Sequence, residues 1–399
     1  MLFEPISKPA VRSKYEIAIA HEIGGFDTPL KKHSGLLNHR GMTKGEIIMS
    51  QIPVAVLGAT GSVGQRFISL LDHHTWFKVV ALAASDRSVG QKYADAARWI
   101  LDDPMPDYAR EMVVVPATPD CIDAKIIFSA LHNEIAKDLE PQFAQAGAAV
   151  CSNASSYRRG EDVPLLLPEI NADHIYLVKE QRKNRGWNGA ILTNPNCTST
   201  GLTIALKALD DMFGVKKVFA VSMQALSGAG YPGVPSLDIM DNVIPNVGNG
   251  GEEEKVEWEP RKMLGKLNNN KIDLADIKFS AHTNRVAVTD GHMVCASVEF
   301  TNPADPEAAE AALGEYRAPA SASELPSSPR PVIEIRNEAD RPQPRLDRLT
   351  GKGMTTVVGR VRRDPILDLK FVVLSHNTIR GAAGGSIYNA ELLVNEGLL

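Results

Sequence analysis

One of the four cysteines stands where a thiol can act as a nucleophile. Cys197 follows Asn-Pro-Asn and precedes a stretch, Thr200–Leu209, with helical spacing of its apolar residues. A cysteine at a loop-to-helix junction lies at the positive end of the helix dipole, which lowers the pKa of the thiol and favours the thiolate. We therefore expect a reactive Cys197. Cys121, Cys151 and Cys295 lie inside apparent strands, and we expect them to be buried and inert.

An arginine and a histidine in the second half of the chain are candidate partners for this thiol. In an extended strand, Arg285 would share one face with Ala287 and Thr289, and it would point into a cavity or solvent if the opposite face is core. Gly291 permits a backbone irregularity that would turn the ring of His292 toward the same place. These residues alone leave open a surface ion-pair arginine and a structural histidine.

A glycine-rich loop between a predicted strand and a predicted helix indicates a dinucleotide site. The apolar run 52–57 precedes GATGSVG at 58–64, and helical spacing follows at 65–71. In this context glycines let backbone N–H groups approach a pyrophosphate at a helix N-terminus, whereas the alternative is a turn without a ligand. The residues expected to contact the cofactor are Gly58, Thr60, Gly61, Ser62, Val63 and Gly64.

The end of the second predicted strand bears on the choice between NAD and NADP. Ser85, Arg87 and Ser88 can hydrogen-bond a 2′-phosphate, and the arginine can neutralise it. Asp86 argues the other way, because an acidic residue at this place binds the ribose 2′-hydroxyl of NAD. The three donors favour NADP.

The order of predicted elements indicates an α/β protein. Strands at 78–83, 112–115, 124–129 and 148–152 and a helix near 134–146 predict a parallel sheet covered on both faces. Candidate strands at 215–224, 287–300, 332–335 and 355–361 alternate more, as in an antiparallel sheet with one wet face. Residues 317–331, rich in Pro, Ser and Ala, predict a surface excursion, and 382–396 a helix.

Composition excludes several classes of protein. The chain has 399 residues, enough for two or three domains, and Lys plus Arg (43) against Asp plus Glu (48) gives a net charge of −5. This mild acidity argues against a nucleic-acid or membrane-surface protein, and the apolar runs are too short to span a bilayer. Few cysteines indicate a reducing compartment. Residues 1–50 lack a signal-peptide pattern and a sustained period, so we expect a disordered extension.

From about residue 52 to the C-terminus the chain resembles the aspartate-semialdehyde dehydrogenases, in the branch found in archaea and fungi. The motifs that carry the resemblance are GATGSVG at 58–64, SNASSYRRGEDVPLLLPEIN at 152–171, NPNCTSTG at 194–201, QALSGAGYPG at 224–233, NRVAVTDGH at 284–292 and NTIRGAAGGS at 377–386. The resemblance implies a Rossmann-type NADP-binding domain at 51–196, completed by 377–399. It also implies an α+β catalytic and dimerisation domain at 197–376, and a homodimer or homotetramer in the cytoplasm.

The resemblance also implies roles for single residues. Cys197 matches the catalytic cysteine, His292 the acid/base histidine, and Gln224 the glutamine that orients the acyl group. The implied reaction is the reversible, NADP-dependent reduction of L-4-aspartyl phosphate to L-aspartate 4-semialdehyde and phosphate through a cysteine thioester. This step belongs to lysine, methionine and threonine biosynthesis. Backbone N–H groups at the start of the helix after Cys197 are expected to stabilise the oxyanion.

The remaining implied residues bind substrate and cofactor, and no metal is expected. Arg285 matches the arginine that binds the substrate carboxylate, and Arg158 a second arginine associated with the phosphate. Glu252 and Lys255 resemble an E-x-x-K pair for the amino group and the phosphate, and Asn377 falls on the nicotinamide side. Alternatives are N-acetyl-glutamyl phosphate reductase, glyceraldehyde-3-phosphate dehydrogenase and a non-catalytic NADP sensor. The first two would keep the same Cys and His, whereas a sensor need not keep both.

Overall fold

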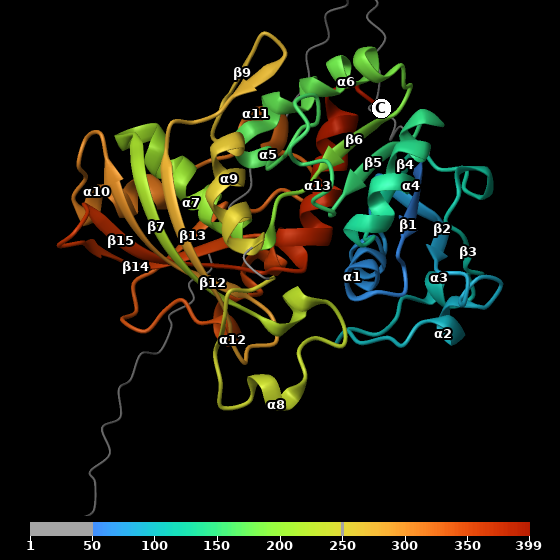
Figure 1. Cartoon of the computed structure of the whole chain (residues 1–399), viewed down its shortest axis with the longest axis horizontal. Helices are drawn as coiled ribbons and strands as arrows, with labels where there is room; N and C mark the ends of the chain where they lie inside the picture. Colours follow the sequence, from blue (N-terminus) through green and yellow to red (C-terminus); the bar gives the residue numbers. More distant parts are fainter. Residues whose placement is uncertain (1–50, 249–250) are drawn as a thin grey trace, which may run out of the picture. The chain divides into compact units, whose positions relative to one another are not determined.

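The first half of the chain forms a six-stranded parallel sheet (Figure 1). The structure, a computed structural model, describes residues 51–248 and 251–399, so the expectation for residues 1–50 lies outside the described residues. The strand order is β3-β2-β1-β4-β5-β6, and every neighbouring pair is parallel. The strands are β1 Ile52–Leu57, β2 Phe77–Ala84, β3 Val115–Pro116, β4 Ile126–Ser129, β5 Ala149–Ser152 and β6 Ala190–Thr193.

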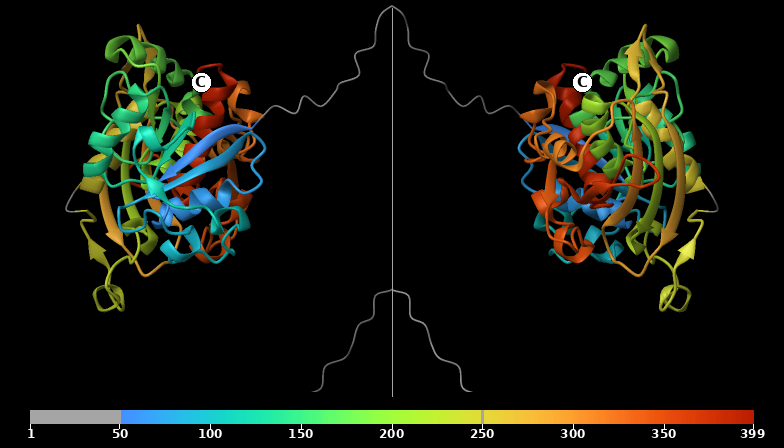
Figure 2. Two further views of the ribbon diagram at one scale, coloured as in Figure 1. Left: turned by 90° about the vertical axis from the view of Figure 1, so that its right-hand side faces the viewer. Right: turned by 90° about the vertical axis from the view of Figure 1, so that its left-hand side faces the viewer.

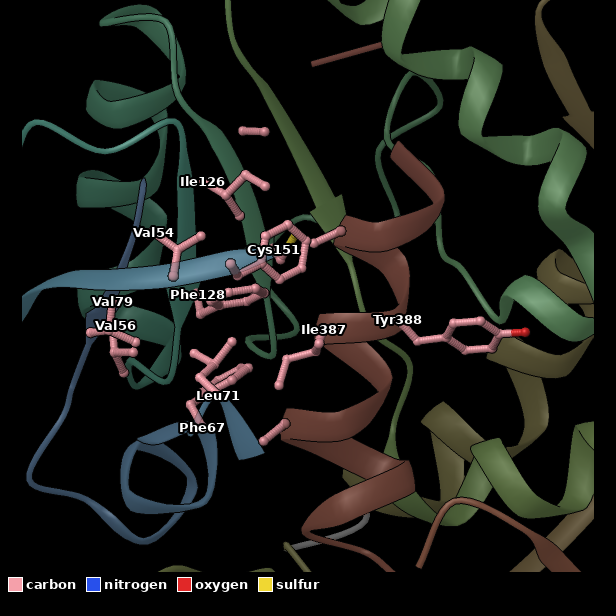
Figure 3. Close-up of a cluster of buried hydrophobic side chains, with 14 of the residues drawn as sticks. Val54, Val56, Phe67, Leu71, Val79, Ile126, Phe128, Cys151, Ile387 and Tyr388 are labelled. Carbon is pink, nitrogen blue, oxygen red and sulfur yellow. The ribbon is translucent and has the colours of Figure 1, made fainter. Parts of the chain in front are cut away.

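Helices cover this sheet because its central strands are apolar on both faces. Every residue of β4, β5 and β6 is buried. The main helices of this half are α1 Ser62–Leu70, α4 Asn133–Gln145 and α6 Leu177–Arg185. The C-terminal helix α13, Gly384–Asn395, returns to pack on β4 and β5. Figure 3 shows Ile387 of α13 pointing at the cluster around Val54 and Phe128, while Tyr388 points the other way.

The strand order reverses between β1 and β4, which is where doubly wound sheets bind ligands. The glycine loop lies at this point and needs its glycines for close approach. Gly58 has φ +72°, and a Cβ there would lie 2.7 Å from the carbonyl oxygen of Ala130. A Cβ at Gly64 would lie 2.2 Å from the oxygen of Gly58. A side chain at either glycine would therefore push the loop away from Ala130 or from the start of α1.

The second half is built on a seven-stranded mixed sheet, order β13-β14-β15-β12-β7-β11-β8. Figure 2, right, shows the parallel strands β7 and β11 side by side. Helices α7 Cys197–Phe213, α9 Gly251–Met263 and α10 Pro306–Gly314 pack against this sheet, and β7 alternates buried and exposed residues. The strands are β7 Val215–Gln224, β8 Ile244–Pro245, β11 Lys278–Arg285, β12 His292–Phe300, β13 Ile333–Arg336, β14 Thr356–Arg363 and β15 Leu369–Ser375.

The parallel sheet with its helices and the mixed sheet confirm the predicted α/β fold class. Short elements complete the described part of the chain. The π-helix η5, Ile379–Ala383, leads into α13. The others are α2 Tyr93–Ala96, α3 Asp107–Arg110, α5 Pro168–Asn171, α8 Ser236–Ile239, α11 Ala320–Ser323, α12 Pro344–Asp347, the hairpin β9 Lys266–Asn268 and β10 Lys271–Asp273, and the 3₁₀ turns η1 Pro119–Cys121, η2 Ala172–Tyr176, η3 Leu226–Ala229 and η4 Thr350–Gly353. No helix among the described residues is long and apolar enough to cross a membrane.

The strand expected at 287–300 is wrong at its start. β11 ends at Arg285 and β12 begins at His292, so residues 286–291 form a connection. Arg285 therefore does not share a strand face with Ala287 and Thr289. The polar sequence of β11, KFSAHTNR, hid this strand, because its pairing with β7 compensates for weak apolar alternation.

One expectation about burial is also wrong, and another is incomplete. Cys121 and Cys295 are exposed, whereas Cys151 in β5 is buried as expected. Cys295 lies on β12 but on the face opposite the core, since burial alternates along that strand. Most of the predicted surface excursion at 317–331 is exposed or partly exposed, but Ala322 and Leu325 enter the core, at 0% and 3% exposure. The proline- and serine-rich composition concealed these two anchors.

Candidate active site

Seven of the residues predicted for the site line one cavity of about 260 Å³. They are Val63, Arg158, Cys197, Gln224, Glu252, Lys255 and Asn377. They come from the glycine loop, the segment after β5, the start of α7, the end of β7, the first turns of α9 and the segment after β15. The mixed sheet and the parallel sheet thus both contribute to the cavity.

Cys197 is the first residue of α7, as the loop-to-helix pattern predicts. The side chain of Asn196 caps this helix, because its Oδ1 accepts hydrogen bonds from the N–H groups of Thr198 (2.9 Å) and Ser199 (3.2 Å). The expectation that N–H groups after Cys197 stabilise an oxyanion is therefore wrong for these two. A Cβ at Gly381 would lie 2.7 Å from the Cβ of Cys197, so glycine lets η5 approach the thiol.

The surroundings of Cys197 favour the neutral thiol over the thiolate. The residue keeps partial exposure to the cavity, yet burial raises its pKa to about 12, and the negative charge of Glu252 acts in the same direction. Arg158 and Arg285 oppose this shift and do not overcome it. The expected net lowering of the Cys197 pKa is therefore wrong in direction, because burial of the thiolate outweighs the groups that lower the pKa.

His292 and Arg285 lie just behind the cavity wall and meet at Ala225. The backbone N–H of Ala225 donates to Nδ1 of His292 (3.0 Å), and Nη1 of Arg285 donates to the Ala225 carbonyl (2.6 Å). Gly228 lines the cavity beside them, since a Cβ there would lie 2.8 Å from Arg285 Nη1 and 2.9 Å from His292 Cε1. The absence of a side chain at Gly228 therefore lets the cavity wall pack closely against both groups.

The hydrogen bond from Ala225 determines which nitrogen of His292 carries the proton. Since Nδ1 accepts, the neutral ring has its hydrogen on Nε2, and this buried atom has no partner among the described residues. Burial lowers the pKa of His292 to about 3, and the charge of Arg285 adds to the shift. The ring is therefore neutral at pH 7 and offers Nε2–H as an unused donor.

The acidic and basic residues of α9 are paired across the cavity floor. Lys255 Nζ donates to Glu252 Oε1 (2.6 Å), and Asn196 Nδ2 donates to Glu252 Oε2 (2.6 Å). Asn377 is held by the N–H of Gly291, which donates to its Oδ1 (2.8 Å), and by Ser227, which accepts from its Nδ2 (2.8 Å). These bonds fix the side chains before any ligand is present.

Arg158 reaches the cavity from the segment after β5. Its Nη1 donates to Glu259 Oε1 (2.7 Å), and its Nη2 donates to the carbonyl of Asn153 (2.8 Å). Its buried Nε has no partner among the described residues. Gln224 is 1% exposed, and its Nε2 lies 3.4 Å from the hydroxyl of Ser222. Sequence reasoning missed Asn153, which lines the cavity, and Glu259 behind it, because no motif marks a contact between distant segments.

The glycine loop fits a dinucleotide phosphate. Gly61 is the N-cap of α1, so no capping side chain bonds the first N–H groups of that helix, and they remain available to an anion. Val63 lines the cavity beside them. Ser85 and Arg87 are exposed in the turn after β2, and Ser88 is half-buried there, outside the cavity. No group of three His, Cys, Asp or Glu that could hold a metal occurs in the described part of the chain.

Comparison with known proteins defines the class to which this fold and site belong. Residues 53–178 match the semialdehyde dehydrogenase NAD binding domain, and residues 206–380 match the semialdehyde dehydrogenase dimerisation domain. The molecule is thus an NAD(P)-binding semialdehyde dehydrogenase with a dimerisation domain.

Whole-chain relatives narrow the class. The aspartate-semialdehyde dehydrogenase of Archaeoglobus fulgidus is 54% identical over 346 residues, 87% of this chain and 99% of the relative. That of Schizosaccharomyces pombe is 46% identical over 355 residues, 87% and 99% of the two chains. The crystal structure of the Candida albicans enzyme with NADP matches with TM-score 0.80 and 42% identity, covering 88% and 100%. The Vibrio cholerae enzyme II complexed with ASA matches with TM-score 0.68 and 27% identity, covering 87% and 99%.

The chain belongs to the aspartate-semialdehyde dehydrogenase family, with relatives at this level in archaea and fungi. Its activity is that of aspartate-semialdehyde dehydrogenase, an oxidoreductase step of the aspartate pathway of amino-acid biosynthesis. The resemblance found from the motifs is confirmed.

Proposed function

We propose that this enzyme reduces L-4-aspartyl phosphate to L-aspartate 4-semialdehyde through a thioester on Cys197, with NADP as the hydride carrier. The observation that supports this most is the composition of the cavity. One thiol and the charged side chains of Arg158, Glu252 and Lys255 line the same space, and an unused imidazole N–H and the Arg285 guanidinium lie directly behind its wall at Gly228.

The charges suit a substrate with a carboxylate, an amino group and a phosphate. Arg285 would hold the carboxylate with its free guanidinium nitrogens, because a planar fork matches a carboxylate. Arg158, with its unpartnered Nε, and Lys255 would bind the phosphate. Glu252 would bind the ammonium group. Gln224, at the end of β7, would orient the acyl carbonyl.

Attack by Cys197 on the acyl phosphate needs no separate base to take up the thiol proton. The thiol and the acyl phosphate dianion give a thioester and hydrogen phosphate, so the thiol proton leaves on the phosphate. This agrees with a thiol pKa of about 12, at which no stored thiolate is available near pH 7. The charge that develops on the carbonyl oxygen would be met by Nε2–H of His292. The histidine therefore enters as a donor, not as the base for the thiol.

The second half of the reaction uses the same groups. Bound NADPH supplies a hydride. His292 would again hold the oxygen of the resulting tetrahedral adduct while the carbon–sulfur bond breaks, and Cys197 then takes a proton to regain its thiol. Asn377, fixed by Gly291 and Ser227, would orient the nicotinamide side of the cavity.

Preference for NADP over NAD, the assembly and the location are part of this proposal. Ser85, Arg87 and Ser88 supply donors at the turn after β2, and the Candida albicans relative was solved with NADP. The dimerisation domain supports a homodimer or a homotetramer. A biosynthetic role in a reducing compartment supports the cytoplasm. The domain boundaries 51–196 with 377–399, and 197–376, also remain proposals.

The test is the reverse reaction. Purified full-length protein should form NADPH from NADP and L-aspartate 4-semialdehyde only when inorganic phosphate is present, and arsenate should replace phosphate. Equal rates without phosphate would contradict the acyl-phosphate product. Faster turnover with N-acetyl-glutamate semialdehyde or glyceraldehyde 3-phosphate would assign the cavity to one of the two related reductases.

A further inference from the structure

We propose that Glu259 is a positioning residue that couples the phosphate-binding arginine, Arg158, to the start of the helix that carries the nucleophile. The inference rests on the roles proposed above for Arg158 and Cys197. Glu259 lies on α9, 2% exposed, and does not line the cavity. It would act through other residues and would not touch substrate.

Each carboxylate oxygen of Glu259 holds one of the two functional segments. Oε1 accepts from Arg158 Nη1 at 2.7 Å, and Oε2 accepts from the backbone N–H of Asn196 at 2.6 Å. Asn196 immediately precedes Cys197 and caps α7 with its side chain. One buried carboxylate therefore ties the guanidinium to the backbone that sets the position of Cys197. Short bonds to a charged acceptor hold this geometry more firmly than neutral ones.

The helix that carries Glu259 binds the same two segments at other points. Residues 252, 255, 259 and 262 follow helical spacing and share one face of α9. Glu252 accepts from the Asn196 side chain at 2.6 Å, while Lys262 Nζ donates to the carbonyls of Arg158 (2.7 Å), Gly160 (2.8 Å) and Val163 (2.8 Å). Lys262 thus holds the backbone of the arginine segment, and Glu259 aims its side chain.

Glu259 also has an electrostatic consequence. Arg158 lowers the pKa of the Cys197 thiol, and Glu259 lies against that guanidinium as a compensating charge. A neutral residue at 259 would leave the positive charge of Arg158 uncompensated. The thiol would then ionise more readily, while the Arg158 side chain would lose the hydrogen bond that orients it toward the phosphate. A residue that only fills space would not produce these two opposite effects.

A consecutive arginine provides the matched control. Arg159 pairs with Glu254 of the same helix at 2.6 Å, but both side chains are exposed, at 56% and 70%. Such exposed pairs contribute little and are screened by salt. Glu254→Gln removes the same charge from the same helix and should change every constant less than about twofold.

The experiment compares Glu259→Gln, Glu259→Asp and Glu254→Gln in the full chain. For Glu259→Gln we expect the KM for phosphate to rise about tenfold, the KM for NADP to stay within about twofold, and alkylation of Cys197 by iodoacetamide, followed by peptide mass, to become several-fold faster. Glu259→Asp keeps the charge but shortens the side chain, so the phosphate KM should rise without faster alkylation.

Two results would overturn the proposal. One is a Glu259→Gln enzyme with wild-type phosphate KM and alkylation rate. The other is a common shift of all constants, NADP included, which indicates general loss of structure. If Glu259→Gln does not fold, Glu259→Asp tests the proposal: a raised KM for phosphate supports it, and a wild-type KM overturns it. Alkylation needs no turnover, so it still tests the coupling if the wild-type protein lacks phosphate-dependent NADPH formation.

Discussion

The cavity at Cys197 and the turn after β2 differ in how far the protein prepares them for a ligand. Around the cavity, Arg285, His292 and Asn377 are buried and already hydrogen-bonded in the free protein. In the turn, Ser85 and Arg87 are exposed to solvent. Removing a group that is already oriented and shielded from water lowers activity strongly. Removing an exposed charge lowers binding only weakly, because water and salt screen its interaction with the ligand. The comparison predicts a gradient of mutational effects from the cavity outward.

The largest effect is expected for Cys197→Ala. Removing the nucleophile should lower turnover by more than about a thousandfold, while binding of NADPH, followed by its fluorescence, stays nearly intact. Cys295→Ala, at an exposed cysteine outside the cavity, is the matched control and should retain activity. Activity of the alanine variant above about a thousandth of wild type would refute the thioester.

The pH dependence of thiol reactivity tests the buried character of the cavity directly. With a pKa of about 12, Cys197 is protonated near neutral pH, and its thiolate fraction grows as pH rises. Inactivation of the free enzyme by iodoacetamide should accelerate about tenfold per pH unit from about pH 6 to 9, without a plateau. A plateau in that range would mean that the helix terminus outweighs burial.

Arg285→Lys should produce an intermediate effect. Lysine keeps the charge but loses the fork that matches a carboxylate, and charge-assisted bonds are worth about 1.5–3 kcal/mol each. We expect the KM for the semialdehyde to rise roughly ten- to a hundredfold and the KM for NADP to change little. Arg159→Lys, at an exposed site, serves as the control. If both constants of Arg285→Lys shift together, the substitution disturbs the connection through Ala225.

Features that depend on neighbouring residues could be predicted from the sequence, whereas features that depend on long-range contacts could not. The glycine loop and the start of α7 are local patterns, so neighbouring residues predict the strand–loop–helix context of Gly58 and Gly64 and the position of Cys197 at a helix start. The pairing of strands in the mixed sheet could not be predicted from neighbouring residues alone. The strand β11 is polar and depends on pairing with β7, and the outward face of Cys295 depends on which side α7 covers.

Electrostatics and tertiary contacts were the least predictable. The direction of the Cys197 pKa shift required the depth of burial, which no motif encodes. Glu259 contacts Arg158 and Asn196 across long stretches of chain, so its partners follow only from the fold. The sequence alone therefore indicated the groups proposed to react, but not the residues that hold them.

The smallest effect is expected at the exposed turn. Arg87→Ala should lower kcat/KM for NADP about two- to tenfold and leave kcat/KM for NAD unchanged, because an exposed charge pair with a 2′-phosphate contributes about 0.5–1.5 kcal/mol. Raising the ionic strength should shrink the difference between variant and wild type, since solvent-exposed charges are screened. Arg110→Ala removes another exposed arginine, at 48% exposure, and controls for general charge. An unchanged ratio of NADP to NAD would assign the choice of cofactor to Ser85 and Ser88, and a wild type that prefers NAD would mean that Asp86 binds the ribose.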